Sequence, residues 1–142
     1  MEDASKPLIS TTSIPSFSEP TVTYSVGEQR KYWNKWAKST LIGQVVFRPD
    51  LGEIKFTSTG IREVLNQPHD DLALKYSVFK DLINILKTAT YLRSAEDEKG
   101  NVNIKFHYLE TEVGGKKSYI VLKETKHNNT IALYSIVMRT KK

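Results

Sequence analysis

Apolar positions along the chain follow a helical period first and a strand period later. Between residues 70 and 88 they recur every three or four positions, which predicts an amphipathic helix. From 102 to 108 apolar and polar residues alternate, and this period of two predicts a half-buried strand. The segments 118–122 (SYIVL) and 131–137 (IALYSIV) are almost continuously apolar, so we expect central strands covered on both faces.

Turn residues separate the shorter elements. Residues 44–48 and 53–57 are expected to be two short strands joined by a Pro-Asp-Leu-Gly turn. A short helix over 60–66 follows them and is stopped by Pro68. The charged segment 94–101 is expected to be a loop.

The pair Gly114-Gly115 predicts a hairpin whose two central residues both adopt positive φ. A strict two-residue hairpin at this point would place Phe106 opposite Lys123. Tyr134 and Ser135 alternate to opposite faces of the last strand, so they reach one cleft only if a bulge intervenes.

The order of elements predicts an α+β domain with two to three N-terminal helices packed on one face of a twisted antiparallel sheet of four to five strands. Residues 1–26 are rich in Ser, Thr and Pro and are expected to be a disordered leader or linker. Residues 27–41 are expected to be an aromatic-rich helical extension. Its Trp33 and Trp36 are expected to pack on the core, and stacking on bases is the less favoured alternative.

Composition narrows the function classes. The chain has 142 residues, a net charge of +5 and no cysteine, which excludes disulfides, thiolate metal ligands and a cysteine nucleophile. The positive charge favours an anionic partner such as nucleic acid, although a small domain of this charge can be merely soluble. No apolar run approaches the roughly 20 residues of a membrane-spanning helix, so we expect no membrane role.

Three segments in fixed order resemble a known family. IKFTSTGIREVLNQPH (54–69), NIKFHYLETEVGGKKSYIVLKE (103–124) and ALYSIV (132–137) are similar to the phage-type branch of the Barnase–EndoU–colicin–RelE nuclease superfamily. The resemblance implies a RelE- or barnase-like nuclease domain over 42–142, placed at the C-terminus of a larger polypeptide. It also implies RNA as partner, a cognate immunity or antitoxin protein, and action in the cytoplasm after delivery by a phage or secretion system.

The same resemblance implies cleavage of RNA to a 2′,3′-cyclic phosphate without metal or cofactor. Such chemistry needs a base, an acid and cations around the phosphate, and histidine suits the first two roles. His69 lies at the entrance of the 70–88 helix, where a phosphate can bind; alternatively it only caps the helix. His107 lies on the polar face of its strand, which a cupped active site would use; alternatively it is an ordinary surface residue.

Lysines and hydroxyls supply the other candidates. Lys55, Lys75 and Lys123 are candidates for holding the phosphate charge. Ser135, a polar residue inside an apolar run, is a candidate for orienting the substrate or a catalytic group. The candidates for substrate binding are Ser58, Thr59, Lys105 and Tyr134.

Two hypotheses follow. The leading one is a metal-independent endoribonuclease of the toxin type, acting on tRNA or mRNA. The alternative is a catalytically inert module on the same fold, either RNA-binding or a phage structural or protein-interaction module. The arrangement of these side chains distinguishes the two hypotheses. The enzyme requires His69 or His107 within hydrogen-bond reach of a lysine around a phosphate-sized hollow.

Overall fold

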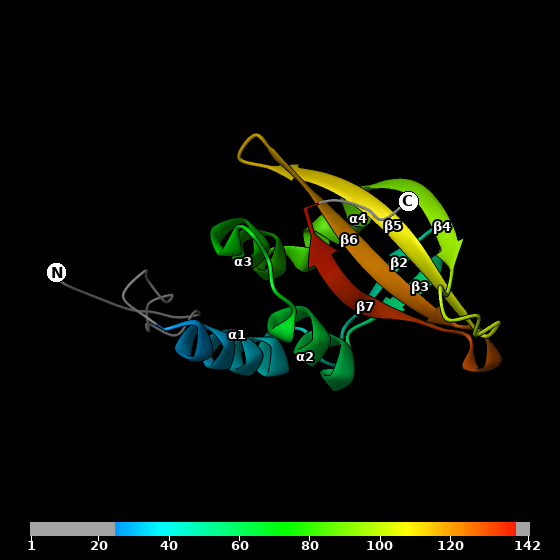
Figure 1. The fold of residues 1–142 in the computed structure, drawn as a ribbon, viewed down its shortest axis with the longest axis horizontal. Helices are drawn as coiled ribbons and strands as arrows, with labels where there is room; N and C mark the ends of the chain where they lie inside the picture. Colours follow the sequence, from blue (N-terminus) through cyan, green and yellow to red (C-terminus); the bar gives the residue numbers. More distant parts are fainter. Residues whose placement is uncertain (1–24, 139–142) are drawn as a thin grey trace, which may run out of the picture. The chain divides into compact units, whose positions relative to one another are not determined.

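The computed structural model describes residues 25–138, which form four α-helices, one 3-10 helix and six strands (Figure 1). The chain divides into two compact units, 1–32 and 33–142. The expected leader over residues 1–26 lies outside the described residues, apart from its last two positions.

The described part of the first unit is the beginning of helix α1 (Val26–Thr40). The helix starts with a reciprocal cap. The hydroxyl oxygen of Ser25 accepts a hydrogen bond from the backbone N–H of Glu28 (3.1 Å), and the Glu28 carboxylate accepts one from the N–H of Ser25 (3.0 Å). Two backbone donors at the helix start are thereby satisfied, which explains why the helix begins here.

The rest of α1 belongs to the second unit and brings its tryptophans into the core. Trp33 is 3% exposed and stacks on Tyr76, with ring centroids 5.4 Å apart. Trp36 lies against Phe79, at 5.6 Å between ring centroids. The prediction that these tryptophans pack on a core is therefore confirmed.

The second unit has one mixed sheet with strand order β2-β3-β7-β6-β5-β4. The strands are β2 (Val45–Arg48), β3 (Gly52–Lys55), β4 (Thr90–Glu96), β5 (Ile104–Val113), β6 (Lys116–Thr125) and β7 (Thr130–Val137). The helices are α2 (Ser58–Asn66), α3 (Leu72–Lys80) and α4 (Leu82–Thr88), with the 3-10 helix η1 at Lys126–Asn128. All strand pairs are antiparallel except β3 with β7, which meet in parallel at Lys55 and Ala132.

One face of this sheet carries the core. Helix α2 packs on β7, and α3 and α4 pack on the neighbouring strands. The inward side chains lie opposite one another across β5, β6 and β7, as the pairs of Leu109 with Ile120 and of Leu122 with Leu133 show. All four are at most 1% exposed, so this face is the apolar interior of the unit.

Two predictions about turns are confirmed. Gly114 and Gly115 have φ of 60° and 80° and close a two-residue hairpin, with Phe106 opposite Lys123 in the expected register. Helix α2 ends at Asn66, because the residue before Pro68 is forced into an extended conformation.

The expected fold is right in class and incomplete in detail. The structure has more elements than two to three helices and four to five strands, and the sheet is not purely antiparallel. The helix expected over 70–88 is two helices, because Asp81 has the non-helical angles φ −115° and ψ 22°. The loop expected over 94–101 begins inside the edge strand β4, whose mixed sequence hides the strand period. Helix α2 is capped by Thr57, whose side chain accepts the N–H of Gly60.

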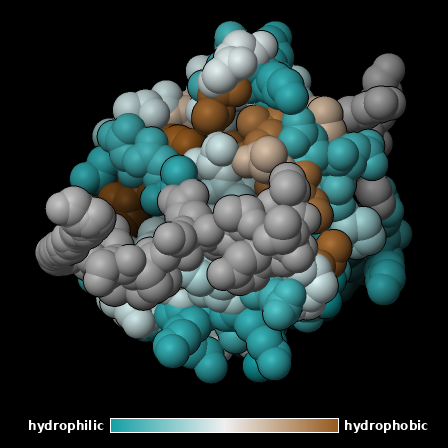
Figure 2. Space-filling model, turned by 90° about the vertical axis from the view of Figure 1, so that its left-hand side faces the viewer, coloured by the Kyte–Doolittle hydropathy of each residue, from teal (hydrophilic) through white to brown (hydrophobic). Residues whose placement is uncertain are grey.

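Apolar side chains on the coloured surface of Figure 2 form separate patches between hydrophilic ones. Among the described residues, the large exposed apolar side chains include Phe47 and Val45 on the edge strand β2. None of the described helices is both long enough and apolar enough to cross a membrane.

Gly60 sets how closely α2 approaches the sheet. A Cβ atom at this position would meet the backbone carbonyl of Leu133 on β7 well inside van der Waals distance, and a backbone atom cannot turn aside. We expect Gly60→Ala to lower the free energy of unfolding by about 1–3 kcal/mol, as overpacked cores do. Thermal and urea unfolding followed by circular dichroism measure this loss.

Gly27→Ala in α1 is the matched control, because its added Cβ has nothing closer than the Ser25 hydroxyl at 3.9 Å. This variant should be no less stable than the wild type, since alanine favours a helix. Equal stability of the Gly60 and Gly27 variants would contradict the close-approach argument.

Candidate functional site

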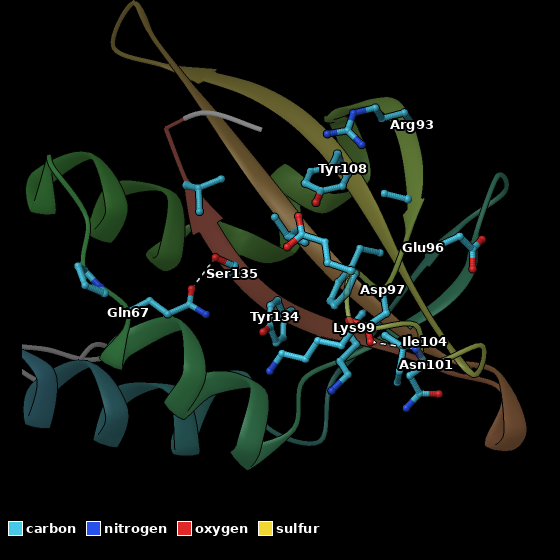
Figure 3. A pocket seen from close by; sticks show the side chains of 17 residues that line it. Gln67, Arg93, Glu96, Asp97, Lys99, Asn101, Ile104, Tyr108, Tyr134 and Ser135 are labelled. Atoms are coloured by element: carbon cyan, nitrogen blue, oxygen red, sulfur yellow. Dashed lines mark hydrogen bonds between the residues drawn. The ribbon is translucent and has the colours of Figure 1, made fainter. Parts of the chain in front are cut away.

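An open cleft of about 910 Å³ lies on the sheet face that faces away from the helical core (Figure 3). Side chains of the four adjacent strands β4, β5, β6 and β7 form its floor. Gln67 and Pro68, between α2 and α3, border one side. The end of β4 and the segment between β4 and β5 border another, with Glu96, Asp97, Glu98, Lys99 and Asn101.

The first row of floor residues pairs a cation with an aromatic ring. Arg93 on β4 lies opposite Tyr108 on β5, and its guanidinium carbon is 4.1 Å from the ring centroid. The Nη2 atom of Arg93 is buried and has no hydrogen-bond partner among the described residues. A buried donor without a partner costs free energy, so this guanidinium is suited to a ligand that brings acceptors.

The second row is aromatic. Phe106 on β5 and Tyr134 on β7 have ring centroids 5.2 Å apart, and the Lys123 ammonium lies 5.7 Å from the Tyr134 centroid. β7 is bulged here, because Val121 pairs with Ser135 and the next residue of β6, Leu122, pairs with Leu133. Because of the bulge, both Tyr134 and Ser135 lie toward the cleft. The alternation along the sequence required such a bulge for the two side chains to share one site.

Polar contacts fix the wall at Gln67. The Ser135 hydroxyl donates to the Gln67 side-chain oxygen at 2.5 Å, drawn as a dashed line in Figure 3. The Lys75 ammonium donates to the Gln67 backbone carbonyl at 2.8 Å, and Lys75 is fully buried. Lys75 and Ser135 therefore act as positioning residues for this wall.

The opposite border is acidic. Glu96, Asp97 and Glu98 line the cleft together with Lys99. One oxygen of Asp97 accepts the backbone N–H of Asn101 at 3.2 Å, which holds the turn. The cleft therefore combines cations on its floor with carboxylates on its border, and it is not a uniformly basic groove.

His69 lies outside the cleft lining and serves the local backbone. Its Nδ1 atom accepts the N–H of Asp71 at 2.9 Å, so Nε2 carries the proton of the neutral ring and is buried without a partner among residues 25–138. Burial, followed by the nearby Lys75 charge, lowers the pKa of His69 below its usual value. The alternative that His69 caps the helix entrance is close to what the structure shows.

His107 is buried on the core side of the sheet, at 5% exposure. Its Nε2 atom lies 2.7 Å from the Glu124 carboxylate and its Nδ1 atom 2.9 Å from the Tyr91 hydroxyl. A carboxylate only accepts, so Nε2 donates to Glu124, and in the neutral ring Nδ1 accepts from Tyr91. The expectation that His107 lies on a face open to substrate is wrong. The face of β5 that carries His107 meets the core, and the face that carries Phe106 and Tyr108 lies toward the cleft.

Some of the other candidates line the cleft and some do not. Of the ten residues proposed from the sequence, Lys123, Tyr134 and Ser135 line the cleft. Four candidates lie neither in its lining nor in the polar contacts that support it: Lys55, Ser58, Thr59 and Lys105. Within residues 25–138, no group of three or more histidine, aspartate or glutamate side chains is arranged to hold a metal ion.

Sequence reasoning missed Arg93, Phe106 and Tyr108. Phe106 and Tyr108 were assigned to the buried face because apolar side chains usually face the core. Arg93 was missed because its strand was not predicted. The sequence did contain a signal, because Phe106 and Tyr108 alternate with His107. A histidine can lie inside a protein when neighbouring side chains bond both of its ring nitrogens, and the two aromatic rings then face outward.

The lowered pKa of His69 gives a pH-dependent stability. A histidine whose folded pKa lies below its unfolded value stabilises the fold fully above about pH 6.5, and this stability is lost as the pH falls below that value. We expect the wild-type Tm to fall between pH 7.5 and 5 more steeply than that of His69→Asn, since asparagine keeps an acceptor and does not titrate. His127→Asn, in exposed η1, should keep the wild-type slope; parallel curves for wild type and His69→Asn would refute the argument.

Tyr91→Phe tests the buried histidine cluster. The change leaves Nδ1 of His107 without its donor, so we expect unfolding to become easier by about 1–3 kcal/mol. Tyr119→Phe is the matched control, because its hydroxyl bonds Glu110 at 3.1 Å, and Glu110 is less buried than His107. Urea unfolding of both variants should show a clear loss for the first and little change for the second, and equal losses would count against a special role of the cluster.

Comparison with family models gives a match that differs from the expected family. Residues 25–134 match the model of large polyvalent protein-associated domain 3. Comparisons with curated proteins and with solved structures give no match. The resemblance to the Barnase–EndoU–colicin–RelE nucleases is therefore wrong: its short segments lie largely within a region that matches a different family. Since the match covers most of the chain, the protein belongs to the large polyvalent protein-associated domain 3 family.

Proposed function

We propose that this domain is a non-catalytic module that binds single-stranded RNA as part of a large, phage-associated polyvalent protein. Membership of a domain family of such proteins supports the setting. The sheet face that none of the described helices covers, with its aromatic rings and its cations, carries the proposal of RNA binding.

Unpaired bases expose flat π-faces and bring a phosphate with each nucleotide. Aromatic side chains on a sheet can stack such bases, and neighbouring cations can hold the backbone. Phe106 and Tyr134 supply half-buried rings that contact each other, and Lys123 lies on β6, the strand between theirs. A double helix hides its base faces, so a floor of this kind favours single strands.

The same geometry argues for binding without cleavage. Metal-independent cleavage needs a base and an acid at the phosphate, and none of the described cleft residues is a histidine. His69 and His107 are both engaged elsewhere, and Lys75 is buried against a carbonyl. The described residues of this cleft therefore do not bring a histidine and a lysine together around a phosphate, as an endoribonuclease would require.

Binding of a fluorescein-labelled, mixed-sequence 12-nucleotide RNA, followed by fluorescence anisotropy, tests the proposal. Phe106→Ala and Tyr134→Ala should each weaken binding by about 1–3 kcal/mol, the usual value of one stacked base. Lys123→Ala should weaken it and flatten the dependence of affinity on salt. The RNA recovered afterwards should be intact on a denaturing gel.

Phe47→Ala is the aromatic control, because Phe47 is 64% exposed on β2 outside the cleft. Lys87→Ala, on the exposed side of α4, is the charge control. Both should bind as the wild type does. Absence of RNA binding by the wild type, or equal losses in controls and cleft variants, would overturn the proposal, and shortened RNA would overturn its non-catalytic part.

A further inference from the structure

The cleft carries a specificity that RNA binding alone does not require. We infer that it selects a guanine base, held by Arg93 at one edge and by Asp97 at another; this inference rests on the proposed RNA binding. Figure 3 shows Arg93 beside Tyr108 toward one end and Asp97 beside Lys99 and Asn101 toward the other.

Arg93 is prepared to read an edge of a base. Its guanidinium lies over the Tyr108 ring, which restricts the side chain and leaves the in-plane N–H groups as donors. Within the described part of the chain, no hydrogen bond or carboxylate pairs with it, and its Nη2 atom is buried. The two parallel donors of arginine match the O6 and N7 acceptors of guanine, the commonest base-specific contact of this side chain.

Asp97 supplies the complementary acceptor. Its Oδ2 atom accepts the N–H of Asn101, and no hydrogen bond from the described residues reaches Oδ1. A carboxylate in a cleft built only for phosphates would repel the ligand. It becomes useful when the ligand presents N–H groups, as guanine does at N1 and N2.

The strand geometry places one base between the two side chains. Arg93 and Asp97 are four residues apart along β4 and its continuation, a distance of about 13 Å at the usual rise per residue. Halfway between them Ala95 pairs with Phe106, so a small side chain lies beside an aromatic ring. The distance along the strand separates the Cα positions, and in our proposal a purine stacked on Phe106 lies between the two side chains with one hydrogen-bonded contact of about 3 Å at each edge.

The other bases fit less well. Adenine places an amino donor where Arg93 needs an acceptor. Uracil lacks the amino group that would donate a hydrogen bond to Asp97. Cytosine carries its acceptors and its amino group on one edge, whereas Arg93 and Asp97 approach from opposite ends. Guanine alone presents acceptors on one edge and two donors on another.

The test uses labelled heptamers UUUXUUU in lithium buffer, where X is guanine, adenine, cytosine or uracil. Anisotropy titrations of the wild type should show the guanine heptamer binding on the order of tenfold more tightly than the others. Two further heptamers remove single contacts: 7-deazaguanine lacks the N7 acceptor, and inosine lacks the N2 amino group. Each should lose most of the preference.

Arg93→Lys and Asp97→Asn identify the protein side. Each should abolish the preference for guanine, measured as the ratio of the affinities of the same variant for the guanine and uridine heptamers. Arg93→Lys should no longer distinguish guanine from 7-deazaguanine, and Asp97→Asn should no longer distinguish guanine from inosine, as coupled partners require. Arg62→Lys and Asp70→Asn, both exposed outside the cleft, should retain the full preference.

The outcomes are distinct. Equal binding of all four heptamers overturns the selection of guanine and leaves RNA binding in place. A guanine preference that survives both cleft variants overturns the assignment to Arg93 and Asp97. If no heptamer and no mixed-sequence RNA binds, the proposed function fails together with the inference.

Discussion

The close approach of Gly60 of α2 to the Leu133 carbonyl of β7 lets the helix lie directly on one face of the sheet. A helix seated this closely on β7 covers Leu133 and Ile136, and the paired residues of β6 and β5 are buried with them. Only a glycine permits the approach, because the obstacle is a backbone atom. Once one face is committed to the helices, the other face is left for side chains that need not pack against a helix.

The bulge that follows Leu133 converts this second face into a site. In a regular strand, Tyr134 and Ser135 would point to opposite sides, and one of them would enter the core. The extra residue keeps Leu133 and Ile136 inside while both polar side chains reach the cleft. The bond from Ser135 to Gln67 then connects the strand to the end of α2, so the contact that builds the core also positions one wall of the cleft.

Local rules predicted the parts of the fold that depend on neighbouring residues. The two glycines at 114–115 were enough to set the register of Phe106 against Lys123, and Pro68 was enough to end α2. The orientation of β5 was not predictable in this way. Its alternation defines two faces, but whether the aromatic face or the face of His107 meets the helices depends on Tyr91 and Glu124, which are distant in sequence. Charge and motif order were weaker guides still, since short segments resembled a family to which the chain does not belong.

Burying His107 while the rings of Phe106 and Tyr134 stay half-exposed reverses the usual arrangement, and the two halves of the reversal support each other. His107 can lie inside because Tyr91 and Glu124 satisfy both ring nitrogens, so its burial does not require an unpaired polar group. Rings left on the outer face keep their apolar surface only partly covered, and the nearest cations lie over those rings instead of pairing with the acidic border. Such a face is incomplete as a structural surface. Its unsatisfied groups, a buried guanidinium nitrogen and half-covered rings, are of the kind that a stacked base would satisfy, and they support the proposed binding of RNA.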